Sequence, residues 1–205
     1  MKEFSACTTK GARYLNILEC KAKIIADKKI HPNGISKTYK NGIWDTGASM
    51  TTISTRIAKE LNLVPFSKAI SSTANGKNIV DLYVVDIELP NEVLIENVQV
   101  ASGNLAEDTD FLIGMDIISR GDFSVTNADG KTTYSYRYPS CETIDYCVEA
   151  HKINKKSYDK KQKEIEETIR QRGNEKCYCG SGRKYRYCHG KKELEELKKQ
   201  GELIK

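Results

Sequence analysis

Alternation of apolar and polar residues is clearest between residues 82 and 100. Leu82–Leu89 and Val93–Val100 are rich in β-branched residues, and their apolar side chains recur at every second position. Pro90-Asn91 separates the two runs and predicts a turn between them. A looser alternation over Arg13–Ile25 predicts an N-terminal strand. This part of the chain is therefore expected to be mainly β.

Shorter elements complete the pattern up to residue 139. Ser36–Trp44 and Thr51–Ser54 are expected to be strands, and Ser54 or Thr55 is expected to cap a short helix over Arg56–Leu61. Thr132–Tyr138 predicts a last strand, whose tyrosines at every second position would share one face, a pattern typical of packing and sometimes of an interface.

The pattern changes at Pro139-Ser140, which would end the sheet. From residue 140 to 172 apolar residues recur at helical spacing among lysines and glutamates, which predicts a mostly polar helix or pair of helices. We therefore expect three parts: a β domain at residues 1–139, a helical linker at 140–172, and a small C-terminal module at 173–205.

The segment Gly42–Ser49 contains the first candidate for chemistry. Ile43-Trp44 would end a buried strand, and Asp45-Thr46-Gly47 would follow as a sharp turn. A carboxylate held at a strand end, near backbone N–H groups and the Thr46 hydroxyl, can orient and deprotonate a water molecule. Taken alone, three turn-forming residues are more often an ordinary turn.

Two further segments favour a functional interpretation of the Asp45-Thr46-Gly47 motif. Phe111–Ile118 predicts a short strand, a bend at Gly114 and a helical turn, in which Asp116 would cap the helix. Between the two motifs, Asn75-Gly76 is the strongest hairpin signal in the chain. The acidic stretch Glu107–Asp110 is interpreted as a water-facing loop.

These three features, in this order, resemble retropepsin-like (clan AA) aspartic proteases over roughly Arg13 to Tyr138. The resemblance implies a closed β-barrel of the acid-protease fold with short helices. It also implies catalysis by Asp45, Thr46 and Gly47, and a flap whose tip would be Ala74, Asn75 and Gly76. Because one chain supplies one Asp-Thr-Gly, the resemblance implies a homodimer in which two copies of Asp45 share a proton.

A second motif lies near the C-terminus. Cys177, Cys179, Cys188 and His189 supply the donors of a tetrahedral Cys₃His zinc site. The stretch resembles the SEC-C motif, with structural zinc and no role in catalysis. A module this small is expected to depend on its metal for folding. Residues Arg183–Tyr187 interleave cations with aromatics, which suits an acidic protein or nucleic-acid partner, although a simple zinc knuckle is equally open.

Composition limits the remaining possibilities. The chain of 205 residues is 39% hydrophobic and 30% charged, which is typical of a soluble protein without a membrane anchor. The N-terminus lacks the apolar run of a secretion signal, and three of seven cysteines fall in the metal motif, so we expect a cytoplasmic protein with reduced thiols. Residues 1–139 are neutral on balance, and residues 140–205 contain the net charge of +5.

Two functions of different classes follow from these features. The first is an aspartic endopeptidase that acts as a homodimer, with a zinc-binding tail that recruits a partner or substrate. The second is a catalytically silent dimeric adaptor on the same scaffold, with the zinc tail responsible for recognition. The intact Asp-Thr-Gly-Ala favours the enzyme, and the sequence indicates neither the substrate nor the pH optimum.

Overall fold

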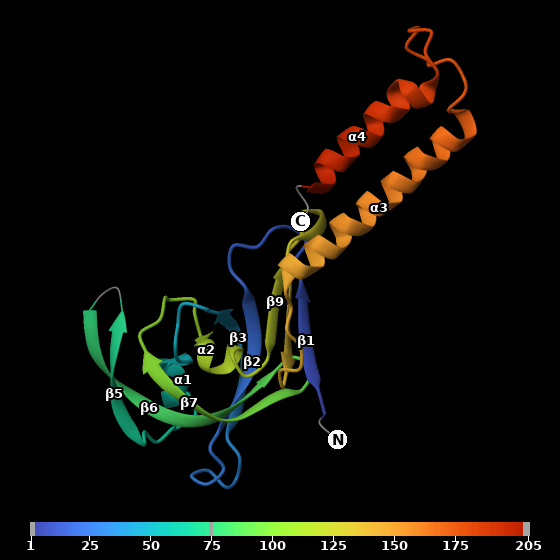
Figure 1. The fold of residues 1–205 in the computed structure, drawn as a ribbon. Helices are drawn as coiled ribbons and strands as arrows, with labels where there is room; N and C mark the ends of the chain where they lie inside the picture. Colours follow the sequence, from blue (N-terminus) through green and yellow to red (C-terminus); the bar gives the residue numbers. More distant parts are fainter. Residues whose placement is uncertain (1–2, 74–75, 203–205) are drawn as a thin grey trace. The chain divides into compact units, whose positions relative to one another are not determined.

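The structure is a computed structural model that describes residues 3–73 and 76–202. The chain divides into two compact units, Met1–Glu142 and Thr143–Lys205, and each is described by itself. The first is mainly β and the second is helical, as Figure 1 shows. Among the described helices, none has the length and apolar character needed to cross a bilayer.

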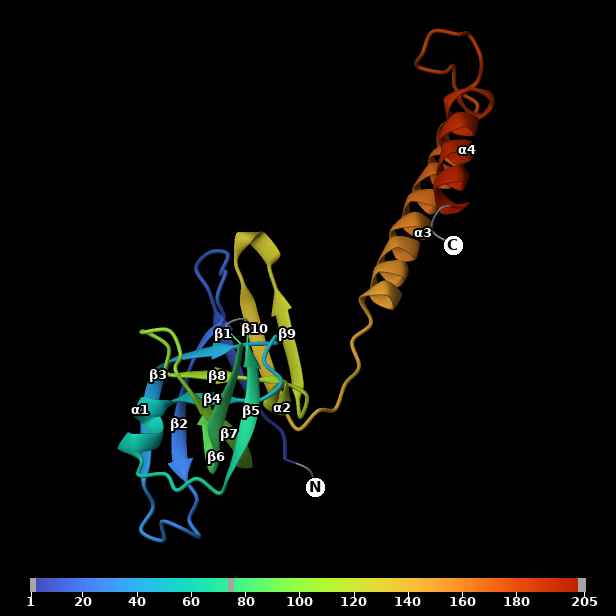
Figure 2. The same ribbon diagram turned by 90° about the vertical axis from the view of Figure 1, so that its left-hand side faces the viewer.

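Six strands of the first unit close into a barrel (Figure 2). Neighbouring strands follow the order β2, β3, β8, β4, β7 and β6, and pairing of Ala26 with Val85 returns β6 to β2. The strands span β2 Glu19–Ala26, β3 Ser36–Trp44, β4 Thr52–Ser54, β6 Gly76–Leu89, β7 Val93–Gly103 and β8 Phe111–Ile113. The expected closed, mainly β fold is confirmed.

Strand β6 is long enough to serve two purposes. Its second half pairs with β7 and β2 in the barrel wall, and its first half pairs with β5 (Ser67–Thr73) as a separate hairpin. The predicted turn at the other end of β6 is also present, because Asn91 and Glu92 adopt positive φ angles of 61° and 59°. That conformation matches the right-handed twist of the strands it connects.

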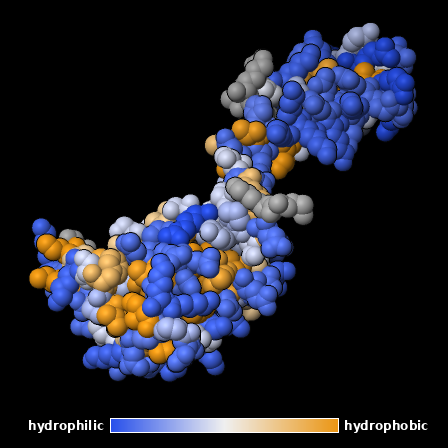
Figure 3. All heavy atoms as spheres, turned by 90° about the horizontal axis from the view of Figure 1, so that it is seen from below, coloured by the Kyte–Doolittle hydropathy of each residue, from blue (hydrophilic) through white to orange (hydrophobic). Residues whose placement is uncertain are grey.

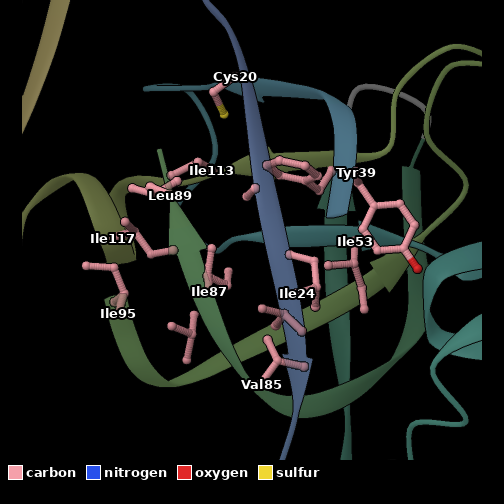
Figure 4. Close-up of a cluster of buried hydrophobic side chains, with 14 of the residues drawn as sticks. Cys20, Ile24, Tyr39, Ile53, Val85, Ile87, Leu89, Ile95, Ile113 and Ile117 are labelled. Carbon is pink, nitrogen blue, oxygen red and sulfur yellow. The ribbon is translucent and has the colours of Figure 1, made fainter. Parts of the chain in front are cut away.

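The inward side chains of these strands form one apolar core (Figure 4). Ile24, Ile53, Val85, Ile87 and Ile95, which come from four strands, are each fully buried, and Val85 and Ile87 show the two-residue spacing of side chains on one face of a strand. Two short helices lie beside the barrel strands, α1 at Thr55–Glu60 and α2 at Met115–Ile118. Ser54 caps α1 by accepting a hydrogen bond from the Ile57 N–H at 3.4 Å, as expected.

A separate three-stranded antiparallel sheet contains β1 (Ser5–Lys10), β10 (Thr133–Tyr138) and β9 (Asp122–Thr126), with a 3₁₀ turn at Ala128–Gly130. Tyr134 and Tyr136 of β10 are buried, so the tyrosine pattern reflects packing. The expected N-terminal strand was partly wrong: β2 begins at Glu19 rather than Arg13, and β1 was not foreseen. Exposed threonines and a lysine in β1 give no apolar alternation to detect.

The described part of the second unit contains two α-helices, α3 (Tyr146–Arg172) and α4 (His189–Glu202), joined by a loop with a 3₁₀ turn at Tyr185–Tyr187. Asp145 caps α3 by accepting hydrogen bonds from the N–H groups of Cys147 and Val148. The two helices pack side by side, and a Cβ atom on Gly201 would lie 2.5 Å from the Tyr158 ring. Of the two forms foreseen for residues 140–172, the single helix is observed.

Candidate active site and metal centre

Asp45 follows β3 directly and enters a loop that continues to β4. Strand β8 lies between these two strands, parallel to β3 and antiparallel to β4. The Asp45 N–H donates to the Ile113 carbonyl at 2.9 Å, which attaches the start of the loop to the end of β8. The apolar run Phe111–Ile113 therefore forms the short strand that the sequence predicted, and its end lies against the start of the Asp45 loop.

The carboxylate of Asp45 is partly exposed and has one hydrogen bond in the described structure. Its Oδ1 atom accepts from the Gly47 N–H at 2.8 Å, and its Oδ2 atom has no partner among the described residues. Thr46 and Gly47 are exposed, and the Thr46 hydroxyl likewise has no partner in the described part of the chain. The loop thus fixes the carboxylate through one oxygen and leaves the other open to a water molecule or a second acid.

Gly114 allows the loop to lie directly against the end of β8. A Cβ atom at this position would lie 2.7 Å from the Met50 carbonyl carbon and 2.9 Å from the Thr51 nitrogen. The Met115 N–H donates to the Ala48 carbonyl at 2.8 Å, and the Gly114 N–H donates to the Thr51 hydroxyl at 3.1 Å. The glycine is needed for this close approach of two backbones rather than for a special φ angle.

The sequence suggested Asp116 as the cap of α2, but Gly114 occupies the cap position, without a side-chain bond. Asp116 lies in the first turn, where its Oδ1 atom accepts from the Ile117 N–H of α2 at 3.1 Å. The same oxygen also accepts from the Thr51 N–H at 2.9 Å and from the Thr51 hydroxyl at 2.7 Å. Thr51 is fully buried, so this carboxylate satisfies polar groups that have no access to water. Asp116 is therefore a positioning residue for the Asp45 loop. The separation of 65 positions between Thr51 and Asp116 explains why local sequence gave no signal.

Asp110 also differs from expectation, because it is 6% exposed rather than part of a water-facing loop. Its carboxylate forms an ion pair with Arg56 of α1 and accepts hydrogen bonds from the N–H groups of Lys40 and Asn41 at 3.2 and 3.1 Å. These interactions connect the residue before the start of β8 to α1 and β3. A Cβ atom on nearby Gly42 would overlap the Phe111 ring, so this strand pair also requires a glycine.

The expected hairpin is present between β5 and β6, where Thr73 pairs with Gly76. Gly76 has a φ angle of 112°, which suits a glycine. Ala74 and Asn75, the other two residues of the predicted flap tip, lie outside the described residues. Ile70 and Ile79 face one another across the hairpin and are 71% and 75% exposed. The role of the hairpin as a flap stays a prediction.

The four C-terminal donors are brought together in the second unit. The ligand atoms of Cys177, Cys179, Cys188 and His189 all lie within 4.8 Å of one another. The Cys177 Sγ to His189 Nδ1 distance is 3.1 Å, and Cys179 Sγ lies 3.6 Å from Cys188 Sγ. A tetrahedral zinc ion spaces sulfur and nitrogen ligands roughly 3.4–3.8 Å apart. The Cys₃His donor set fits a zinc ion, and the 3.6 Å between the Cys179 and Cys188 sulfurs lies within this range.

The surrounding loop favours ionised sulfur at this cluster. Hydrogen bonds from the Ser181 hydroxyl and backbone lower the pKa of Cys179 to about 6. Burial opposes ionisation of Cys177, but the backbone N–H groups of Cys179 and His189 outweigh it and lower its pKa. The neighbouring Cys177 sulfur raises the pKa of His189. Thiolates are the form that binds metal.

One part of the expected partner surface was wrong. Tyr185 is buried and donates to Glu193 Oε2 at 2.6 Å, so it supports α4 and is not available to a partner. Tyr187 and Tyr178 are 66% and 74% exposed, and the Tyr178 ring lies 4.5 Å from the His189 ring. The alternation of cations and aromatics around residue 185 therefore partly reflects local packing.

Two family models match the chain. Residues 37–120 match the model described as gag-polyprotein putative aspartyl protease, and residues 174–191 match the SEC-C motif. No curated protein sequence matches.

Solved structures similar to the chain include the following three. The crystal structure of a retropepsin-like aspartic protease from Rickettsia conorii is 15% identical, with a TM-score of 0.42, over 67% of this chain and 97% of that one. The solution structure of Simian Foamy Virus (mac) protease is 15% identical, with a TM-score of 0.32, over 49% of this chain and 91% of that one. The crystal structure of the retroviral protease-like domain of Ddi1 from Leishmania major is 14% identical, with a TM-score of 0.35, over 54% of this chain and 82% of that one.

Proposed function

We propose that the protein is a homodimeric aspartic endopeptidase, since residues 37–120 match the model described as gag-polyprotein putative aspartyl protease and residues 174–191 match the SEC-C motif. Asp45 of each subunit would contribute one carboxylate to a shared active site. The zinc-binding tail would recruit a partner or substrate.

The geometry of the Asp45 loop is the observation that carries this proposal. One carboxylate oxygen is fixed by the Gly47 N–H, and the other has no partner in the described part of the chain. The backbone around it is held by β8, Gly114 and the Thr51–Asp116 pair. The loop is thus held in place and leaves one carboxylate oxygen open. A second copy of the same loop could therefore approach this oxygen with its own carboxylate.

Two carboxylates at contact distance share one proton, because both cannot readily be ionised. The ionised carboxylate takes a proton from water as the water oxygen attacks the peptide carbonyl carbon. The protonated carboxyl donates a hydrogen bond to the carbonyl oxygen and stabilises the tetrahedral intermediate. As the intermediate collapses, the carboxyl group that took the proton from water gives it to the peptide nitrogen, and the C–N bond breaks to release an amine and a carboxylic acid. The exposed Thr46 hydroxyl would brace the two loops against one another, and the Gly47 backbone would contact the peptide.

The proposal predicts that Asp45→Asn abolishes cleavage. Purified full-length protein would be incubated with a peptide library from mildly acidic to neutral pH, and cleavage would be read by mass spectrometry. An aspartyl-protease transition-state analogue should inhibit the wild type. Asp129→Asn is the matched control and should cleave normally. Retained cleavage in Asp45→Asn would refute the assignment, and no cleavage by the wild type would favour the silent adaptor.

A mixing experiment tests whether two subunits share the site. When wild type and Asp45→Asn are mixed in equal amounts and allowed to exchange subunits, only about one quarter of the dimers have two aspartates. Activity per wild-type chain should therefore fall to about half. An unchanged activity per wild-type chain after demonstrated subunit exchange would contradict a shared site.

The tail would contribute structure rather than catalysis. Four protein ligands complete a tetrahedral zinc shell and leave no position for a reactive water molecule. Cys177, Cys179, Cys188 and His189 would hold the ion and fix the loop against α4. A Cys₃His site needs reduced thiols, which supports our proposal of a cytoplasmic location.

A further inference from the structure

One short segment of α3 contains a charge imbalance equal to that of the whole chain. His151–Lys163 has six lysines and one aspartate. The remaining residues hold 27 basic and 27 acidic side chains, so outside this segment the charges cancel. The net charge of +5 is thus concentrated within about 20 Å of helix.

Five of the six lysines share one face of α3. At about 100° per residue they fall within an arc of about 140°, and Asp159 is the one acidic residue among them. All five are exposed, and Figure 3 shows a predominantly hydrophilic surface on the helical unit. The stripe consists of Lys152, Lys155, Lys156, Lys160 and Lys163.

Ion pairs neutralise two arginines near the end of α3 and little of the lysine stripe. Arg170 pairs with Glu167 at 2.6 Å, and Arg172 pairs with Glu175 at 2.9 Å. Within the stripe, Lys160 has a 3.9 Å contact with Glu164. The other four ammonium groups have no ion pair or hydrogen bond to any described residue. Their charge is therefore not neutralised within the fold.

We propose that the lysine stripe of α3 binds the phosphate backbone of nucleic acid, without reading its sequence. Lys152 and Lys163 are separated by roughly 16 Å along the helix axis, which corresponds to about five phosphates of one strand. Ammonium groups on flexible stems suit a row of phosphates, and each contact gains free energy by releasing a condensed counterion.

The chemistry of the stripe disfavours the two other macromolecular partners. Protein interfaces are enriched in aromatic residues and arginine and depleted in lysine, whereas residues 151–163 contain no arginine. A helix lying in a membrane surface needs an apolar face beside the basic one. Between Lys152 and Lys163 the large apolar side chains are Ile153, which is 63% exposed, and Tyr158, whose ring is packed against Gly201 of α4, so one exposed isoleucine is all that lies beside the lysines and no continuous apolar face does.

The test is binding of zinc-loaded full-length protein to a fluorescent 20-base-pair DNA duplex, measured by anisotropy across a salt series. With four phosphate contacts, affinity should fall roughly a hundredfold between 50 and 200 mM salt. The quadruple variant Lys152→Gln/Lys155→Gln/Lys156→Gln/Lys163→Gln should lose most of the binding and most of the salt dependence. Two duplexes of unrelated sequence should bind alike.

Two variants control for folding and for total charge. Four Lys→Arg changes at the same positions should retain binding. Lys28→Gln/Lys29→Gln/Lys59→Gln/Lys131→Gln removes equal charge from exposed positions of the first unit and should bind like the wild type. The proposal would be overturned if both glutamine variants lost binding equally, or if the quadruple glutamine variant of the stripe still bound the duplex. Binding of the wild type to phosphatidylserine vesicles but not to DNA would also overturn it. Asp45→Asn should bind DNA normally, so this test is independent of proteolysis.

Discussion

At the scale of single residues, the candidate active site depends on positions that do not take part in chemistry. Thr51 and Asp116 satisfy one another behind the loop, and Gly114 lets the loop lie against β8. Buried polar groups that lose a partner are costly, and a well-packed backbone contact leaves no room for an added methyl group. The position of Asp45 is therefore set largely by residues around it.

Gly114→Ala should destabilise the first unit by about 1–3 kcal/mol, because its Cβ atom would overlap the backbone at Met50 and Thr51. Urea unfolding can be followed by fluorescence of Trp44, the single tryptophan, which is buried beside the Phe123 ring. Gly103→Ala is the control: its Cβ atom would lie 3.2 Å from a Thr52 methyl carbon, so its cost should be smaller. Equal stability of Gly114→Ala and wild type would contradict the close approach.

At the scale of elements, one carboxylate ties the second sheet to the segment after it. Asp122 of β9 accepts from Arg137 of β10 at 2.7 Å, from the Ser140 hydroxyl at 2.5 Å and from the Cys141 N–H at 3.0 Å. Hydrogen bonds from Ser140, Cys141 and Arg137 lower the pKa of Asp122 to about 2. The ionised form is therefore favoured in the folded state.

This interaction predicts a specific loss of stability in acid. Because the folded pKa of Asp122 lies below its unfolded value, its contribution is complete above about pH 4 and is lost as the pH falls towards 2. Asp122→Asn should flatten this part of the stability curve, measured as urea midpoints between pH 5 and pH 2. Asp129→Asn should leave the curve unchanged, because the Asp129 side chain has no partner in the described structure. An identical acid response in Asp122→Asn and wild type would contradict the prediction.

The same scale shows why sequence predicted some elements and missed others. Leu82–Leu89 and Val93–Val100 alternate strongly because one face of each strand is buried, so local pattern was sufficient. Strand β1 has few buried residues and is defined by its pairing with β10, more than 120 residues away. The motifs around Asp45 and Cys177 were visible because their chemistry needs fixed local spacing. The partners of Asp110 and Asp116 were not, because both carboxylates reach across the fold.

At the scale of the whole molecule, the two units obtain their stability from different sources. The first has a closed barrel with a large apolar core. The described part of the second buries few apolar side chains, among them Tyr185 and Leu197. A unit with so small a core usually needs a metal or a similar constraint to fold. The units should therefore respond independently to removal of metal.

Chelation should unfold the second unit and leave the first intact. On chelation, the purified protein should release about one zinc ion per chain. Its far-ultraviolet helical signal should then fall, because the ion that joins α4 to the Cys177–His189 loop has been removed. Trp44 lies in the barrel, so the urea midpoint followed by its fluorescence should not change. Cys179→Ser should behave like the chelated wild type, whereas Cys147→Ser, which also removes an exposed thiol, should retain both zinc and helicity. A shift of the Trp44 midpoint on chelation would mean that the barrel itself needs the metal, and that result would contradict independent units.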